Sequence, residues 1–405
     1  MPSCYTKPNG TSRGKAVFKP DPDKFLFNID TLWLNVESHF YDEVMDAGFR
    51  DLLIEGREYQ SDNGECLSID LNVPEYENPV VFDIMIGQAP QYQYSIRNDS
   101  MAIYFSKSLK ESNSPMKIQI NQFLLWDKGV ERAYKEGLSV LKSIGFVPFQ
   151  SKLNRVDFAV HSDQYKWNYE DIKKLTYPEN FAKDNFPNPI KLNPFTLDFE
   201  TVAHGDRSRC YLRIYNKSKE IEVKRKYYFY EIYNSKDMDT TNVWNVEIEV
   251  RRPFMKELKE RLEENYYPIF DDFDYCLEVN GLSRLWTLLM ERYSHDSPFW
   301  RVLEKGDKNH FNQIEEHNLD ICKDIESNAD REIAQISGRL MTLVTNEANY
   351  SLDAALNKFR NKVMDLEMQG KRKDWHELVE KKKAMIHSHT INRQIKKPTP
   401  EKKQK

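Results

Sequence analysis

The chain has 405 residues, of which 40% are hydrophobic and 13% aromatic, enough for one large domain with an extension or for two domains. Charged residues of both signs make up 30%, which favours a folded chain, and the net charge of −5 counts mildly against nucleic acid as a partner. No run approaches the ~20 apolar residues of a membrane span, and the five scattered cysteines form no CxxC pair. These features argue against a membrane protein, a disulfide scaffold and a structural zinc site, and a cytoplasmic location is expected.

The N-terminal half is predicted to alternate between short strands and one helix. Residues 1–24 are expected to form a flexible arm, and apolar residues then alternate with others from Phe25, as in a strand. An amphipathic helix is expected over 129–144, where apolar residues recur at helical spacing. The further strands predicted here cover 79–86, 94–105 and 116–120.

Three later segments show clean alternation of period two, namely 155–161, 211–217 and 243–251. The Pro- and Asn-rich stretch 177–194 is expected to be irregular. After Arg252 the pattern becomes helical, with Pro253 in the first turn.

The C-terminal third is predicted to be mostly helical, from about 280 to 390. Short heptad-like runs in it fit either a helical hairpin on the domain surface or a dimerising helix. The basic tail 391–405 is expected to be disordered. The predicted fold class is α+β, with a curved, mostly antiparallel sheet, helices on one face, and a helical C-terminal region over 306–390.

Alternation in the three later strands places apolar side chains on one face of the sheet and reactive ones on the other. On the second face a phenol lies among cations, carboxylates and an imidazole, supplied by Arg155, Asp157, His161, Arg213, Tyr215, Lys217, Glu247, Glu249 and Arg251. Solvated polar faces are common in antiparallel sheets, so the pattern alone is weak evidence of a site.

The chemistry of these residues makes Tyr215 a candidate nucleophile. A tyrosine hydroxyl has a pKa of ~10, so it needs nearby positive charge or a base to attack. Arg213 and Lys217 supply positive charge on both sides of it. Asp157, Glu247 and Glu249 are hard oxygen ligands suited to Mg²⁺ or Mn²⁺, and His161 would favour Mn²⁺. These are the parts needed for phosphodiester transesterification.

Basic residues are concentrated around the same strand. The residues predicted to contact DNA are Arg207, Arg209, Lys219, Lys224, Arg225 and Lys226. The run 224–230 interleaves cations with aromatic rings, which suits single-stranded DNA, although its rings could equally pack in the core.

The segments RVDFAVHSD (155–163), SRCYLRIYNKSKE (208–220) and VWNVEIEVRR (243–252) resemble the Rep_trans family of replication initiation factors. This family comprises rolling-circle initiators of small plasmids and related relaxases of integrative conjugative elements. The resemblance covers roughly 25–305 and is most specific at RIYNK. It implies that Tyr215 is the nucleophile and that Asp157, Glu247 and Glu249 hold the metal. His161 replaces an acidic residue of the family pattern.

The resemblance implies a DNA-nicking catalytic domain over 25–305. The expected function is metal-dependent nicking of one strand at an origin, with a 5′-phosphotyrosine intermediate and a 3′-hydroxyl primer. The expected partners are origin DNA with a single-stranded or hairpin nick site, a second copy of the chain, and a host helicase. Two alternatives stay open: a conjugative relaxase with the same chemistry, and a non-catalytic DNA-binding protein of the same fold. A glycosidase pair formed by Glu247 and Glu249 is disfavoured, because nothing else suggests sugar chemistry.

Overall fold

In a computed structural model, the chain forms one open antiparallel sheet with helices packed on it. The structure describes residues 19–305 except 64–65, 89, 108–113, 176–187, 193–198 and 263–268, together with 311, 354, 356–358 and 360–361. The sequence predictions for 306–390 and 391–405 lie outside these residues, apart from 311 and a few helical positions between 354 and 361.

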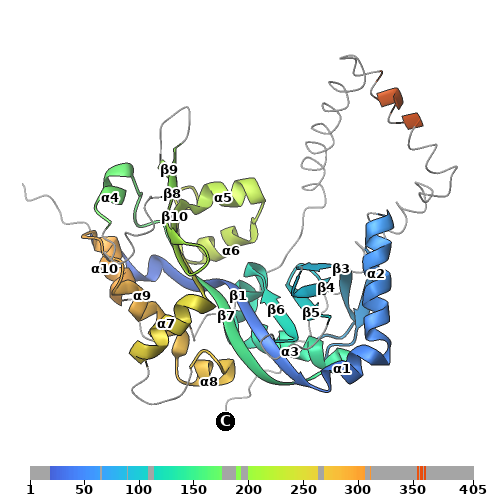
Figure 1. The fold of residues 1–405 in the computed structure, drawn as a ribbon. Coiled ribbons are helices and arrows are strands. Elements are labelled where there is room, and N and C mark those ends of the chain that lie inside the picture. The colour runs from blue at the N-terminus through green and yellow to red at the C-terminus, as the bar shows by residue number, and fades with distance from the viewer. Residues whose placement is uncertain are drawn as a thin grey trace, which may run out of the picture.

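Eleven strands make up the sheet, in the order β2-β3-β4-β5-β6-β1-β7-β11-β10-β9-β8. Their bounds are β1 Phe25–His39, β2 Ser68–Leu71, β3 Val80–Gln88, β4 Tyr92–Arg97, β5 Met101–Ser106, β6 Met116–Ile120, β7 Val147–Ser162, β8 Asn188–Leu192, β9 Phe199–Asp206, β10 Cys210–Asn216 and β11 Trp244–Arg251. The long strands β1 and β7 pair along their whole length and join the two halves of the molecule (Figure 1).

The helices begin with a 3₁₀ turn, η1 Pro22–Lys24, and a π-helical turn, η2 Met45–Phe49. The α-helices are α1 Tyr41–Val44, α2 Arg50–Asn63, α3 Gln122–Ile144, α4 Tyr169–Lys173, α5 Lys217–Lys224, α6 Tyr228–Ser235, α7 Arg252–Leu262, α8 Phe273–Glu278, α9 Gly281–Met290 and α10 Pro298–Lys305. The α+β class, the antiparallel sheet and the helical region after its last strand are confirmed.

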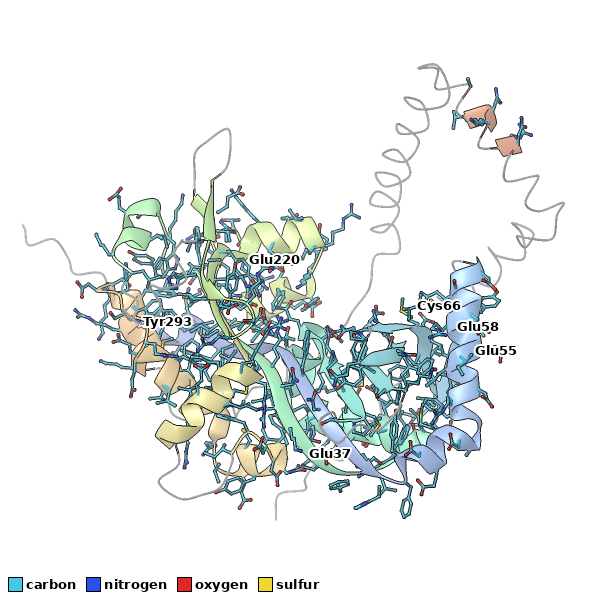
Figure 2. All side chains as sticks on the ribbon, viewed as in Figure 1. Glu37, Glu55, Glu58, Cys66, Glu220 and Tyr293 are labelled. Atoms are coloured by element: carbon cyan, nitrogen blue, oxygen red, sulfur yellow. The ribbon has the colours of Figure 1, made fainter. Side chains whose placement is uncertain are left out.

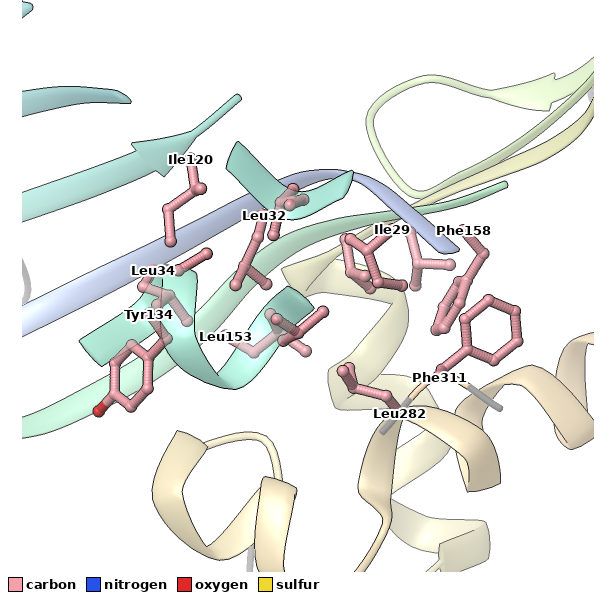
Figure 3. Packing of buried hydrophobic residues seen from close by; sticks show 14 of the residues in the cluster. Ile29, Leu32, Leu34, Ile120, Tyr134, Leu153, Phe158, Leu282 and Phe311 are labelled. Atoms are coloured by element: carbon pink, nitrogen blue, oxygen red, sulfur yellow. The ribbon is translucent and has the colours of Figure 1, made fainter. Parts of the chain in front are cut away.

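The main core lies on one face of the sheet. Alternate residues of the strands, such as Leu32, Leu34 and Phe158, are fully buried there against helices. Figure 3 shows them packed with Tyr134 of α3 and Leu282 of α9. Burying each such aliphatic or aromatic side chain contributes about 1.5–3 kcal/mol, so this face holds most of the stabilising apolar surface.

A second, smaller core lies on the opposite face and covers one end of it. Helices α5 and α6 contribute Ile221 and Phe229, which pack with Leu26 of β1 and Trp126 of α3. Helix α3 contributes side chains to both cores, and Gly129 interrupts it with φ 74° and ψ 166°. Helices therefore pack on the main-core face and also on one end of the other face, where the predicted site lies.

Several elements differ from the sequence predictions. The segment 94–105 holds two strands, β4 and β5, because a tight turn at 98–100 reverses the chain. Strand β8 lies within the stretch expected to be irregular. Residues 19–24, expected in the flexible arm, are described, and the backbone N–H of Asp21 donates to Gln164 Oε1 at 3.2 Å.

Candidate functional site

The pairing of three neighbouring strands assembles the predicted site. In β10 and β11, Arg213 lies opposite Glu247 and Tyr215 lies opposite Asn245. In β11 and β7, Glu249 lies opposite Asp157. The apolar residues between them, including Ile248 and Phe158, point into the main core. Alternation therefore leaves the phenol, the carboxylates and Arg213 together on one face, as the sequence predicts.

The hydroxyl of Tyr215 has three polar neighbours. It donates to Glu247 Oε2 at 2.9 Å and accepts from Asn245 Nδ2 at 2.9 Å. Lys217 Nζ lies 3.5 Å from it, at the limit of a hydrogen bond. Arg213 Nη2 donates to the other oxygen of Glu247, so the carboxylate bridges the phenol and the guanidinium. The contact with Arg213 holds the Glu247 carboxylate in place, so that one of its oxygens lies where it can accept the phenol proton.

Burial and charge set the proton affinities of this pair. Burial raises the pKa of Glu247 to about 7, although the Arg213 charge opposes the shift. Burial and the Glu247 charge hold the pKa of Tyr215 well above its ordinary value. The phenol therefore stays protonated at neutral pH, and Glu247 titrates where a general base is most effective.

Lys217 does not extend the strand as the sequence predicts. Strand β10 ends at Asn216, whose side chain caps helix α5, and Lys217 is the first residue of that helix. Lys217 is fully buried, with Nζ 2.7 Å from Glu220 Oε2 and 3.7 Å from Asp30 Oδ2. Glu220 lies on the side of α5 that faces the strands (Figure 2). Two carboxylates thus hold the ammonium beside the Tyr215 hydroxyl.

A β-bulge in β1 supplies one of those carboxylates. The register with β7 shifts between Ile29 and Thr31, so one extra residue, Asp30, is accommodated there. Asp30 and Thr31 both line the groove beside Tyr215. Asp30 also accepts from the indole of Trp126 at 2.7 Å, which fixes its orientation.

The three carboxylates predicted to bind metal lie close together and are held by arginines. Arg155 donates to both oxygens of Asp157, at 2.7 and 2.5 Å, and to Glu249 at 3.0 Å. Arg251 donates to the other oxygen of Glu249 at 2.5 Å. Among the described residues, no group of three or more acidic, His or Cys side chains has the arrangement of a metal site. The donor chemistry of Asp157 and Glu249 suits Mg²⁺ or Mn²⁺, but an ion would have to take the place of Arg155.

His161 is not brought together with these carboxylates. It lies four residues beyond Asp157 in β7, about 13 Å along the strand. Its ring stacks on Trp126 with centroids 4.6 Å apart, and Nδ1 lies 2.9 Å from the Tyr233 hydroxyl. Burial and the Lys217 charge lower the pKa of His161 to about 3, so the ring is neutral. The structure gives His161 a packing role in the second core.

A groove of about 1330 Å³ runs past Tyr215 between the strands and helices α5 and α6. This is larger than the ~300–1,000 Å³ of a small-molecule site. Three of the predicted DNA-binding residues line it, namely Lys219, Lys224 and Lys226. Tyr228 and Tyr230 line it too, whereas Phe229 is fully buried in the second core. The aromatic run 224–230 therefore serves both the groove and the core.

The other predicted DNA-binding residues lie elsewhere. Arg207 is at the β9–β10 turn, over the ring of Tyr211 at 4.9 Å, and Arg209 pairs with Glu257 of α7. Arg225 ends helix α5 in a left-handed conformation with φ 53° and does not line the groove. The basic stretch of the sequence is thus split between the groove and the far end of β10.

Sequence reasoning missed several residues that contact the site. Alternation in 243–251 puts Asn245 on the site face but gives it no role, and the sequence identifies Arg155 and Arg251 only as cations. Glu220 had a usable signal, because a Lys and a Glu three residues apart meet on one helix face. Asp30 had no such signal, because nothing in the local sequence pattern predicts the bulge.

The chain matches no protein-family model and no curated protein. It is similar to a solved structure of a rolling circle replication initiator protein from Geobacillus stearothermophilus, with a TM-score of 0.31 and 12% identity. The similarity covers 64% of this chain and 84% of that one. So distant a likeness carries no weight for function, and the Rep_trans resemblance stays a prediction. Across the described residues, no helix is both long and apolar enough to cross a membrane.

Proposed function

We propose that this protein nicks one strand of DNA with Tyr215 as the nucleophile, as an initiator of rolling-circle replication. The observation that carries the proposal is the hydrogen bond from the Tyr215 hydroxyl to Glu247, 2.9 Å long, at the side of a groove whose lining holds both lysines and carboxylates. A nucleophile, a base beside it and cations near the scissile phosphate are the three parts that strand transfer requires.

The reaction begins with proton transfer from Tyr215 to Glu247. The phenolic oxygen attacks a backbone phosphorus, a Tyr–O–P bond forms, and the bond from phosphorus to the 3′-oxygen breaks. The 5′ end stays on the tyrosine, and the leaving 3′-oxygen takes a proton from water. Rejoining is the reverse: the 3′-hydroxyl gives its proton to the solvent as its oxygen attacks the phosphotyrosine, the Tyr–O–P bond breaks, and Glu247 returns its proton to the phenolic oxygen. The diester preserves the linkage energy, so rejoining requires no ATP.

Cations beside the tyrosine stabilise the charge that develops on the phosphate. Arg213 and Lys217 both lie next to the Tyr215 side chain. Because Lys217 is held between two carboxylates, it is positioned before substrate arrives, and such preorganised charge is the larger part of electrostatic catalysis.

A divalent ion, Mg²⁺ or Mn²⁺, forms part of the proposal. Asp157 and Glu249 would hold it in exchange for Arg155, and it would offset charge on the scissile phosphate. Glu247 keeps its contact with Tyr215, so it is assigned as the base, and His161 is left out of the metal set.

A relaxase of a conjugative element would use the same chemistry, so the proposal covers strand transfer in either setting. A non-catalytic DNA-binding protein is disfavoured, because such a protein has no need of a buried carboxylate bonded to a tyrosine hydroxyl. The proposed partners are origin DNA, a second copy of the chain and a host helicase.

The test is covalent capture. Wild type and Tyr215→Phe are incubated with a single-stranded origin oligonucleotide and Mg²⁺ or Mn²⁺, and a shifted band is sought on a denaturing gel. Tyr211→Phe is the matched control, because Tyr211 shares the strand and the face but lies opposite Glu249. Wild type and the control should form the adduct and Tyr215→Phe should not. An adduct that persists in Tyr215→Phe would place the nucleophile elsewhere.

A further inference from the structure

The face of the sheet that carries Tyr215 continues across the N-terminal half as a chain of cations and aromatic rings. Trp33 of β1 is flanked by two cations, Lys117 Nζ and the Arg155 guanidinium, each 4.7 Å from its ring centroid. Arg251 of β11 lies 5.3 Å from the same centroid. This row of cations and rings therefore begins at the arginines that hold Asp157 and Glu249, and it leads away from them across the sheet.

Strand register explains why these groups meet. Trp33 lies opposite Arg155, and Arg155 lies opposite Arg251. On the other side, Lys117 of β6 lies opposite Tyr104 of β5. Alternation keeps all five on one face, while their neighbours Leu32 and Ile118 enter the main core.

Lys117 is a buried cation, and no carboxylate among the described residues pairs with it. Its ammonium lies among three rings, 4.7 Å from Trp33, 5.1 Å from Tyr92 and 4.4 Å from Tyr104, and donates to Gln88. Burial, then the charges of Arg251 and Arg97, lower its pKa to about 8, and no carboxylate contributes. Burying an unpaired charge is costly, and an incoming anion would relieve that cost.

Arg97 of β4 ends the chain of cations. It lies 5.1 Å from the Tyr104 ring and donates to Ser95 and to the Ile86 carbonyl. Asp83 is opposite it in β3, but its carboxylate accepts from Ser68 at 2.9 Å. From Arg251 to Arg97 the face spans six strands, about 24 Å at the usual strand spacing of ~4.8 Å.

The charges on this face do not balance. Four cations, Arg97, Lys117, Arg155 and Arg251, lie along it with three carboxylates, Asp83, Asp157 and Glu249. Asp83 lies opposite Arg97, so among the described residues at this far end Lys117 is the cation whose pKa no carboxylate raises. The rings hold the cations at fixed positions, so little conformational entropy is lost when a ligand binds them.

We propose that this face, defined by Trp33, Tyr104 and the cations Arg97, Lys117, Arg155 and Arg251, binds the phosphates of single-stranded DNA and leads the strand away from Tyr215. The inference rests on the proposed function, since it assigns the path of the same substrate. A single strand fits because a flexible backbone can follow cations spaced one or two strands apart. Binding along this path is largely independent of base sequence, because it is made to phosphates.

The test measures binding in the Tyr215→Phe background, where no turnover interferes. Affinity for a fluorescent single-stranded oligonucleotide is measured by anisotropy over a series of salt concentrations, with Arg97→Gln alone and with Lys117→Gln added. Each lost phosphate contact should lower the slope of log K against log salt by ~0.7, so the double variant should lose about 1.4. Affinity at low salt should fall at least fivefold.

Arg57→Gln is the matched control. Arg57 also places a guanidinium over a tyrosine ring, 5.4 Å from the Tyr94 centroid, but in α2. Tyr94 points into the main core, on the opposite face of the sheet. The control should bind as the parent does, and thermal melting should show that Arg97→Gln is folded, whatever the fate of Lys117→Gln.

Two results would overturn the inference. One is an unchanged affinity and salt slope in a folded Arg97→Gln variant. The other is weaker binding of a duplex with unchanged binding of the single strand, which would assign the face to duplex DNA. Failure of the proposed function has a separate signature: the chain with Tyr215 intact would form no covalent adduct, whatever the binding data show.

Discussion

Replacing Glu247 by glutamine tests the proton transfer at the centre of the proposed mechanism. The amide has nearly the same shape, so the Tyr215 ring should stay in place, but the amide is far too weak a base to take the phenol proton. A positioned general base contributes about 10²–10⁴-fold to a rate, so single-turnover nicking by Glu247→Gln should fall by about that factor. Binding of single-stranded DNA should change little, because Glu247 is 4% exposed.

The pH profile gives the sharper readout. Burial raises the pKa of Glu247 to about 7, and a general base acts only as the carboxylate. Wild-type nicking should therefore rise with pH through about 7, and this rise should be absent from Glu247→Gln. The matched control is Glu249→Gln, two residues along the same face, which should shift the dependence on metal concentration and keep the pH profile. A Glu247→Gln variant that nicks at the wild-type rate, or that keeps the inflection near 7, would refute the assignment.

Three further predictions concern the surroundings of the site. His161→Phe should keep metal-dependent nicking, because the ring packs in the second core and its depressed pKa of about 3 keeps it neutral. If titration with Mn²⁺ shows a changed metal requirement in this variant, His161 is a metal ligand after all. Lys217→Met should lower the free energy of unfolding by roughly 3–5 kcal/mol in urea titrations, since the buried Asp30 carboxylate loses its ion pair and Glu220 keeps only Lys224 and Lys226; a loss under about 1 kcal/mol would contradict this. Gly205→Ala should lower the free energy of unfolding more than Gly48→Ala does in the same assay. Both glycines have φ above 100°, but only at Gly205 would the new Cβ lie 2.3 Å from a carbonyl oxygen of the next strand. Equal losses of free energy in the two variants would argue against that clash.

Local alternation in the sequence is enough to predict which side chains of the central strands share a face. Strict alternation in 155–161 and 243–251 placed Asp157, Glu247 and Glu249 together, since neighbouring residues of a strand must point to opposite sides. It also placed Arg213 and Tyr215 on that face, and strand pairing then brought all five into one cluster. The α+β class followed from the same periodicities.

The surroundings of these residues could not be predicted from local pattern, because they depend on long-range packing. The bulge that brings Asp30 beside Lys217, and the two helices that cover one end of the site face, depend on packing between segments far apart in the sequence. His161 keeps the predicted strand position but meets Trp126 and Tyr233, so its environment is aromatic. A local pattern fixes the direction of a side chain, whereas its partners, burial and proton affinity are set by whichever distant residues fold against it.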